Sequence, residues 1–232
     1  MGLAAAAVSV ALIGSANATP TLFVQVNGDT NNANYTTSLN PSGLTDTGAL
    51  TGYSYGYNGT GFGVSGVVNG ILALGSPNLN SNAQTITIGS FTGNMITVAI
   101  SETGLTQPLG AYLIGSSFTA NSLTGTVTSV KQSSYVNANN VAFATTDLIG
   151  THTFNGLGTD SSQITTPNLT GPYSLTQIYQ VSVTPGTCGS GTTCGSTNDT
   201  INTYLVPEPG TMAVLLVGLL GLTFVYSRRR QA

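Results

Sequence analysis

The feature that most constrains the fold of this chain is an alternation of apolar and hydroxyl-bearing residues that recurs between Thr21 and Leu205. Leu22, Val24 and Val26 occupy every second position near its start, and Tyr173–Thr184 continues the pattern near its end. A period of two places successive side chains on opposite faces of a strand. Short turn signals separate the runs, and this region contains no long helical pattern or fixed repeat period. The sequence therefore predicts an all-β domain, a single β-sandwich or jelly roll rather than a solenoid.

The end of this domain is also predicted from local pattern. The segment Pro185–Asn198 is rich in Gly, Ser and Thr, and Thr200–Leu205 returns to alternation. We expect a hairpin loop between the strand that begins at Tyr173 and a last strand at Thr200–Leu205. Leu205 is the expected end of the domain.

Charged residues make up only 5% of the chain, against about 25% in a typical soluble domain. Before the C-terminal tail, Lys131 is the one basic residue. The same region contains six acidic residues: Asp29, Asp46, Glu102, Asp147, Asp160 and Asp199. A surface so poor in cations cannot neutralise phosphates, so nucleic-acid binding is excluded as a function class. The composition suits an exported β-protein with a hydroxyl- and amide-rich surface.

The C-terminal tail has three parts in a fixed order. Pro207-Glu208-Pro209 comes first, Met212–Tyr226 carries no charged side chain, and Arg228-Arg229-Arg230 follow. As a helix, the apolar part would span about 22 Å, against a hydrocarbon core of about 30 Å. Snorkelling arginines and an interfacial tyrosine extend that reach and place the arginines on the cytoplasmic side. The tail predicts a transmembrane helix, because a buried core helix would be amphipathic.

This order of elements resembles the PEP-CTERM sorting signal of Gram-negative bacteria. Such a segment is also labelled the ice-binding protein C-terminal domain, a name that does not imply ice binding. The resemblance covers about Val206 to Arg230, and Pro207, Glu208 and Pro209 match the motif position by position. It implies recognition by an exosortase, a membrane-embedded cysteine transpeptidase. It also implies a membrane-anchored precursor that is moved to the cell surface or into extracellular polymer.

The N-terminus predicts an export signal. Leu3–Gly14 is small and apolar, and Ala16-Asn17-Ala18 forms an A-x-A cleavage pattern. An alanine-rich helix of the mature domain is the disfavoured alternative, since a sorting signal at the other end requires export. We therefore expect three segments: a signal peptide at 1–18 cleaved after Ala18, a β-rich domain at 19–205, and the sorting signal at 206–232.

Cys188 and Cys194 are the only cysteines. An even number in an exported chain favours a disulfide. A metal site would need about four ligands, which this neighbourhood does not supply. Asn27–Asn34 has oxygen-bearing residues at calcium-loop spacing, but Ala33 stands at a ligand position, so an Asx-rich turn is the better interpretation. No metal or cofactor is expected.

The sequence offers little evidence for a catalytic site. His152 is the only histidine, with Asp147 and Asp160 close in sequence, yet no Gly-x-Ser-x-Gly elbow marks a nucleophile. Glu102 is the only glutamate before the tail and has no partner motif for glycoside hydrolysis. The sequence predicts a non-catalytic domain, with a secreted hydrolase as the third and least favoured hypothesis.

A stripe of tyrosines, Tyr53, Tyr55 and Tyr57, offers a possible sugar-stacking or self-association face. Ordinary packing on one side of a sheet is the favoured alternative. The leading hypothesis is a surface or extracellular-matrix protein associated with exopolysaccharide or biofilm. A carbohydrate-binding module, and less so an ice-binding one, is the second hypothesis.

Overall fold

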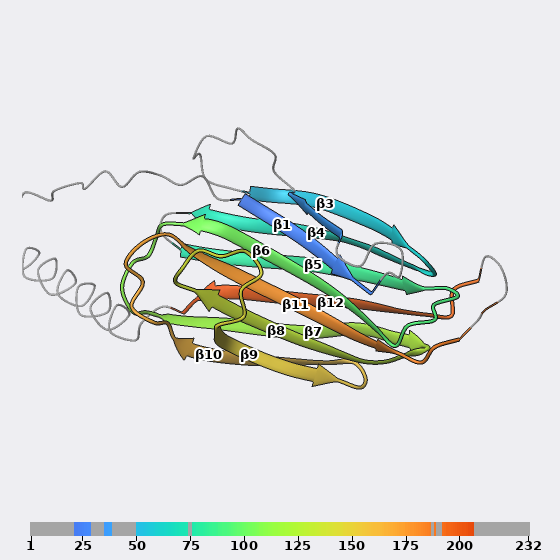
Figure 1. Ribbon diagram of the computed structural model, residues 1–232. Helices are drawn as coiled ribbons and strands as arrows, with labels where there is room; N and C mark the ends of the chain where they lie inside the picture. The colour runs from blue at the N-terminus through green and yellow to red at the C-terminus, as the bar shows by residue number, and fades with distance from the viewer. Residues whose placement is uncertain are drawn as a thin grey trace, which may run out of the picture.

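The computed structural model describes residues 21–28, 35–38, 50–73, 76–186, 188 and 192–206. Strands in these ranges form two six-stranded antiparallel sheets that pack face to face (Figure 1). The first sheet has the order β2 (Tyr35–Ser38), β1 (Thr21–Asn27), β6 (Met95–Leu105), β11 (Tyr173–Val183), β8 (Val127–Asn137) and β9 (Asp147–Phe154). The second has the order β10 (Gly158–Thr165), β7 (Leu113–Gly125), β12 (Gly195–Leu205), β5 (Ser76–Ile88), β4 (Phe62–Ala73) and β3 (Leu50–Gly59). The predicted all-β sandwich is confirmed.

The alternation in the sequence becomes the inside and outside of this sandwich. In β1, Leu22, Val24 and Val26 are fully buried, while the residues between them are partly exposed. β11 likewise turns Leu175 and Val181 into the interior. Inward-facing residues of both sheets form a single hydrophobic cluster. Burial of this cluster is the main favourable term in folding.

Most connections cross between the sheets. The chain passes from one sheet to the other at every step from β5 to β8 and again from β9 to β12. Connecting loops therefore gather at the two ends of the sandwich (Figure 1). The predicted hairpin around Pro185–Asn198 is wrong, because β11 and β12 lie in different sheets. A loop that crosses the sandwich looks like a hairpin loop in sequence, since both are short and polar.

The last strand is also longer than expected. β12 begins at Gly195 rather than Thr200, since Gly195–Asn198 pairs with both β5 and β7. Two neighbouring strands supply hydrogen bonds that outweigh the weak strand preference of Gly, Ser and Asn. β12 ends at Leu205, the residue predicted for the end of the last strand.

Candidate functional site

The last strand ends where the expected sorting signal starts. Leu205 pairs with Ile114 of β7. One residue later, the Val206 N–H donates a hydrogen bond to the Leu113 carbonyl oxygen at 2.9 Å. Pro207 follows directly. The sandwich is therefore hydrogen-bonded up to the residue before the Pro-Glu-Pro motif, with no linker between them.

Several predicted features lie outside the described residues. They are the cleavage site at Ala18, the motif Pro207–Pro209, the apolar segment Met212–Tyr226, the arginines 228–230 and most of the Asn27–Asn34 turn. Over the ranges that the structure does describe, it contains no helix long and apolar enough to cross a membrane. The roles assigned to these features remain predictions.

Two loops cover the end of the sandwich at which β12 ends and the chain leaves the domain. Loop 106–112 joins β6 to β7, and loop 166–172 joins β10 to β11. Gly110 and Leu169 exchange two backbone hydrogen bonds, at 2.8 and 3.0 Å, and so join the loops. A third hydrogen bond comes from Tyr173, the first residue of β11. Its hydroxyl donates to the Gln107 carbonyl oxygen of loop 106–112 at 2.7 Å.

A third loop, 138–146, folds over the outer face of the first sheet near the same end. The Gly104 N–H donates to the Asn140 side-chain oxygen at 2.6 Å. The Phe143 ring packs edge-on against Phe23 of β1, with ring centroids 6.2 Å apart. Loop 138–146 thus contacts the end of β6 and the neighbouring strand β1.

Together these loops make an uncharged and partly apolar surface beside the chain exit. Leu109 of the first loop is 47% exposed and Val141 of the third is 53% exposed. None of the residues 106–112, 138–146 or 166–172 carries a charge. We call this surface the exit end of the sandwich.

The interior contains a polar layer that links the two sheets. Gln177 of β11 donates to the Leu79 carbonyl oxygen at 2.6 Å and to the Thr203 hydroxyl at 2.9 Å. Its side-chain oxygen accepts from Ser81 at 2.6 Å. The Tyr179 hydroxyl donates to the Ser81 carbonyl oxygen at 3.1 Å. The buried polar atoms of Gln177 are thus satisfied across the sandwich, as burial requires.

A second part of this layer surrounds Asp199 of β12. Its carboxylate accepts hydrogen bonds from Gln132 at 3.1 Å and from Thr197 at 2.6 Å. Gln132 also donates to the Thr119 carbonyl oxygen at 2.9 Å. Burial raises the pKa of Asp199 to about 7, and the two hydrogen bonds oppose that rise. The layer fixes the register of the two sheets, because a slip would leave these groups unpaired.

Glu102 of β6 is a buried acid that this polar layer does not include. It is fully buried, and within the described chain neither carboxyl oxygen has a hydrogen-bond partner. Gly70 of β4 makes room for it: a Cβ at that position would lie 2.6 Å from a carboxyl oxygen of Glu102. Burial raises the pKa of Glu102 to about 8. The side chain is neutral at pH 7 and faces the protein interior.

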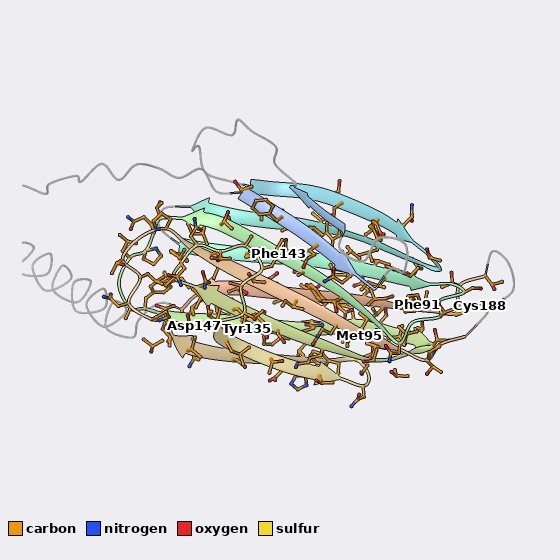
Figure 2. The ribbon with its side chains drawn as sticks, viewed as in Figure 1. Phe91, Met95, Tyr135, Phe143, Asp147 and Cys188 are labelled. Atoms are coloured by element: carbon orange, nitrogen blue, oxygen red, sulfur yellow. A yellow bond between two sulfur atoms is a disulfide. The ribbon has the colours of Figure 1, made fainter. Side chains whose placement is uncertain are left out.

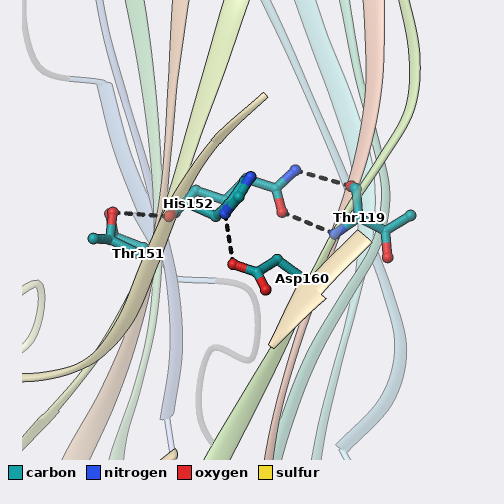
Figure 3. Close-up of polar contacts among 6 residues, drawn as sticks. Thr119, Thr151, His152 and Asp160 are labelled. Carbon is teal, nitrogen blue, oxygen red and sulfur yellow. Dashed lines mark hydrogen bonds and ion pairs between the residues drawn. The ribbon is translucent and has the colours of Figure 1, made fainter. Parts of the chain in front are cut away.

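His152 pairs with one of the two aspartates near it in sequence (Figure 3). Its Nδ1 lies 2.5 Å from a carboxylate oxygen of Asp160, and the side chains are 39% and 41% exposed. Asp147 instead lies at the start of β9 and pairs with Val136. Within the described residues, no serine hydroxyl bonds to His152. The pair of His152 and Asp160 therefore joins the edge strands β9 and β10 of the two sheets. It does not form part of a Ser-His-Asp unit.

The predicted disulfide is confirmed. Cys188 and Cys194 are joined, with Cα atoms 5.8 Å apart. The Cys194 N–H donates to the Ile88 carbonyl oxygen at 2.6 Å, and the Thr126 N–H donates to the Cys194 carbonyl oxygen at 3.0 Å. Figure 2 shows Cys188 at the end of the sandwich opposite the exit end. The part of the chain described here holds no cluster of three or more metal-ligating side chains.

Two of the three tyrosines of the stripe, Tyr55 and Tyr57, pack against other apolar residues. Tyr55 is 9% exposed and belongs to the hydrophobic cluster, and Tyr57 packs on Phe62 with ring centroids 6.0 Å apart. The side chain of Tyr53 lies outside the described features. Ordinary strand packing, the favoured alternative, accounts for Tyr55 and Tyr57, which leaves Tyr55 unable to stack on a sugar.

A different polar surface lies on the outer face of the second sheet. Asn121 donates to the Asn198 side-chain oxygen at 3.1 Å, and Asn198 donates to Thr85 at 3.1 Å. Thr124 and Ser196 share a hydrogen bond at 3.0 Å. These five residues, the outer ladder, span β7, β12 and β5 and carry no charge.

Fold and chain exit together define an all-β domain that is attached at its last strand to a C-terminal signal. The chain carries the PEP-CTERM protein-sorting motif, which matches residues 205–230. The sorting motif that the tail predicted is therefore confirmed over these residues. The motif begins at the final residue of β12.

Solved structures with a detectable likeness share little with this chain. TmCBM61 in complex with β-1,4-galactotriose is 12% identical, over 63% of this chain and 88% of that one, with a TM-score of 0.33. The CBM22-1 and GH10 modules of Clostridium thermocellum xylanase 10B with xylohexaose are 9% identical, over 71% and 29%, with a TM-score of 0.32. The CBM22-1 xylan-binding domain of Paenibacillus barcinonensis Xyn10C is 12% identical, over 68% and 97%, with a TM-score of 0.29. Scores this low support no argument about ligand. No match to a curated protein was found.

Proposed function

We propose that this chain is an exported, non-catalytic protein that an exosortase-like transpeptidase sorts and processes through its C-terminal signal. The observation that carries the proposal is the sorting motif at residues 205–230, which begins at the last residue of a folded domain. The motif is read as an address, and the apolar segment after it holds the precursor in the membrane.

In this proposal, Pro207, Glu208 and Pro209 are what the processing enzyme recognises. The two prolines fix the backbone and remove two donors, so the motif is extended and cannot join the preceding strand or a following helix. The arginines at 228–230 stay on the cytoplasmic side. Residues 1–18 are removed on export, and residues 19–205 form the delivered domain.

The destination we propose is the cell surface or an exopolysaccharide matrix of a Gram-negative bacterium. The charge-poor, hydroxyl-rich surface supports it, since such a surface mixes with polysaccharide with little charge repulsion. Repeated crossings between the sheets support a jelly-roll topology for the delivered domain. No step of this proposal requires a catalytic residue.

A second candidate function is neutral-carbohydrate binding, and one observation favours it. The outer ladder presents amide and hydroxyl groups already fixed by hydrogen bonds across three strands. Such pre-organised donors and acceptors bind sugar hydroxyls with little loss of side-chain entropy. Ice binding has no separate support.

Processing is tested with a variant that replaces Pro207, Glu208 and Pro209 by alanine. We expect the variant to stay as an unprocessed precursor in the membrane fraction, while the parent protein is shortened and released. Thr211→Ala, between the motif and the apolar segment, is the matched control and should be processed normally. Normal shortening and release of the alanine variant would refute the proposed role of the motif.

A further inference from the structure

We propose that the exit end of the sandwich rests on the lipid surface of the membrane for as long as the sorting tail is attached. The surface consists of the loops 106–112, 138–146 and 166–172, with Leu109 as its central contact. This inference rests on the proposed function, since it takes the tail to hold the protein in the membrane.

The first argument is where the chain leaves the domain. Val206 is hydrogen-bonded to Leu113, the first residue of β7. Leu109 lies in the loop that leads into this strand, and its neighbour Gly110 is bonded to Leu169 of the adjoining loop. The exit of the chain and the exposed leucine therefore belong to one hydrogen-bonded end of the sandwich.

The second argument is reach. From Val206 to Met212, where the apolar segment starts, the chain can extend about 20 Å at most. The strands between the two ends are long: β12 has 11 residues and β7 has 13. At about 3.3 Å per residue the far end lies roughly 35 Å from the exit end. A tether this short keeps the exit end within reach of the membrane, whereas the far end reaches it only if the domain lies on its side.

The third argument is the chemistry of the surface. Leu109 and Val141 are 47% and 53% exposed, and the three loops carry no charged residue. Exposed apolar side chains on uncharged loops are favoured at the boundary between headgroups and acyl chains. The loops themselves add no charge repulsion against an anionic lipid surface, although Asp147 follows loop 138–146 directly at this end.

The tether decides how strongly this contact forms. One or two partly exposed apolar side chains bind a membrane too weakly to hold a free domain there. A domain tied within about 20 Å experiences a high effective concentration of membrane surface. The same side chains then shift the balance between the docked and the undocked domain several-fold. Removal of the tail abolishes the contact, so processing and release are one event.

The far end of the sandwich supplies the matched control. Leu157, in the turn between β9 and β10, is 72% exposed, more than Leu109. Met95 and Cys188 mark the same far end (Figure 2). An apolar side chain there is equally available to lipid if exposure alone decides the contact.

The test places an environment-sensitive NBD fluorophore on Leu109→Cys or Leu157→Cys. The full chain, with its native disulfide, is incorporated into phosphatidylcholine vesicles that contain spin-labelled phosphatidylcholine. We expect a blue shift and several-fold stronger quenching at position 109 than at 157. An added Val141→Asp should reduce the quenching at 109.

Four other outcomes overturn the inference, and they separate it from the proposed function. Equal quenching at both positions, in protein that floats with the vesicles, would contradict the oriented contact. It would leave the proposed sorting role intact. A blue shift at position 109 that occurs only when exosortase is present would show that this surface contacts the enzyme instead of lipid. Unreduced quenching at 109 with Val141→Asp removes the apolar contact. Protein that does not float with the vesicles removes both the contact and the membrane hold.

Discussion

Glu102 shows how one side chain makes the stability of the sandwich depend on pH. Burial raises the pKa of its carboxyl group to about 8 in the folded chain, against about 4.3 in an unfolded chain. Between these values the folded state holds the proton and the unfolded state loses it. The contribution of Glu102 to stability is therefore complete below about pH 4.3 and falls as pH rises towards about 8.

Glu102→Gln removes this titration and keeps the shape of the neutral acid. We expect the free energy of unfolding of the parent protein to fall from pH 5 to pH 8, by up to about 1.4 kcal/mol per pH unit. The variant should show a much flatter dependence. Urea denaturation at a series of pH values measures both.

In the Glu102→Gln variant, Asp199 still makes the free energy of unfolding depend on pH. Its pKa is raised to about 7, so it acts in the same direction as Glu102 and is still present in the variant. An unchanged slope in Glu102→Gln would mean that the carboxyl group at position 102 reaches solvent or a partner in the folded protein.

Single residues differ in how much of their role could be predicted from sequence. The Cys188–Cys194 disulfide was predictable, because the pair is close in sequence and no other cysteine competes. Pairing of His152 with Asp160 rather than Asp147 depends on a turn that joins the edges of two sheets. Burial of Glu102 depends on Gly70, far away in sequence. Neither contact has a local signal.

At the scale of elements, the turn between β7 and β8 carries a steric requirement. Gly125 has a φ of 62°, and a Cβ there would lie 1.8 Å from the Cys194 carbonyl oxygen. The turn and the residues beside the disulfide thus pack backbone against backbone. Only glycine fits both the left-handed conformation and the space.

Gly125→Ala should destabilise the protein by about 2 kcal/mol or more, because neither backbone can move aside cheaply. Gly156→Ala is the control, since a Cβ at Gly156 meets nothing within 4 Å. We expect that substitution to change stability by less than about 0.5 kcal/mol. Thermal unfolding of both variants is the measurement, and equal shifts in Tm would contradict the packing described for Gly125.

Strands were predictable where their inward positions are mostly apolar, as in β1 and β11. They were missed or shortened where inward positions are polar. β12 points Asp199 and Thr203 inward, and β7 points Ser116 inward. Their partners, such as Gln132 and Gln177, come from the opposite sheet. A polar inward position reads as a loop in sequence, and only the assembled sandwich supplies its hydrogen bond.

On the scale of the whole molecule, charge is nearly absent from the β-domain. Lys131 is the one cation between residues 19 and 206. Asp199 and Glu102 are buried, so they add little to the field outside the protein. Association with other molecules must then depend on hydrogen bonds and apolar contact, which salt screens weakly.

Retention on a neutral polysaccharide column should therefore hardly depend on salt. Raising sodium chloride from about 0.05 M to about 0.5 M should change retention by less than about twofold. Asn198→Ala should weaken retention, because it removes the centre of the outer ladder, which bonds to both Asn121 and Thr85. Thr153→Ala, at an exposed position on β9 of the other sheet, should leave retention unchanged. Steep loss of retention with salt, or equal effects of the two substitutions, would assign any binding to a surface other than the outer ladder.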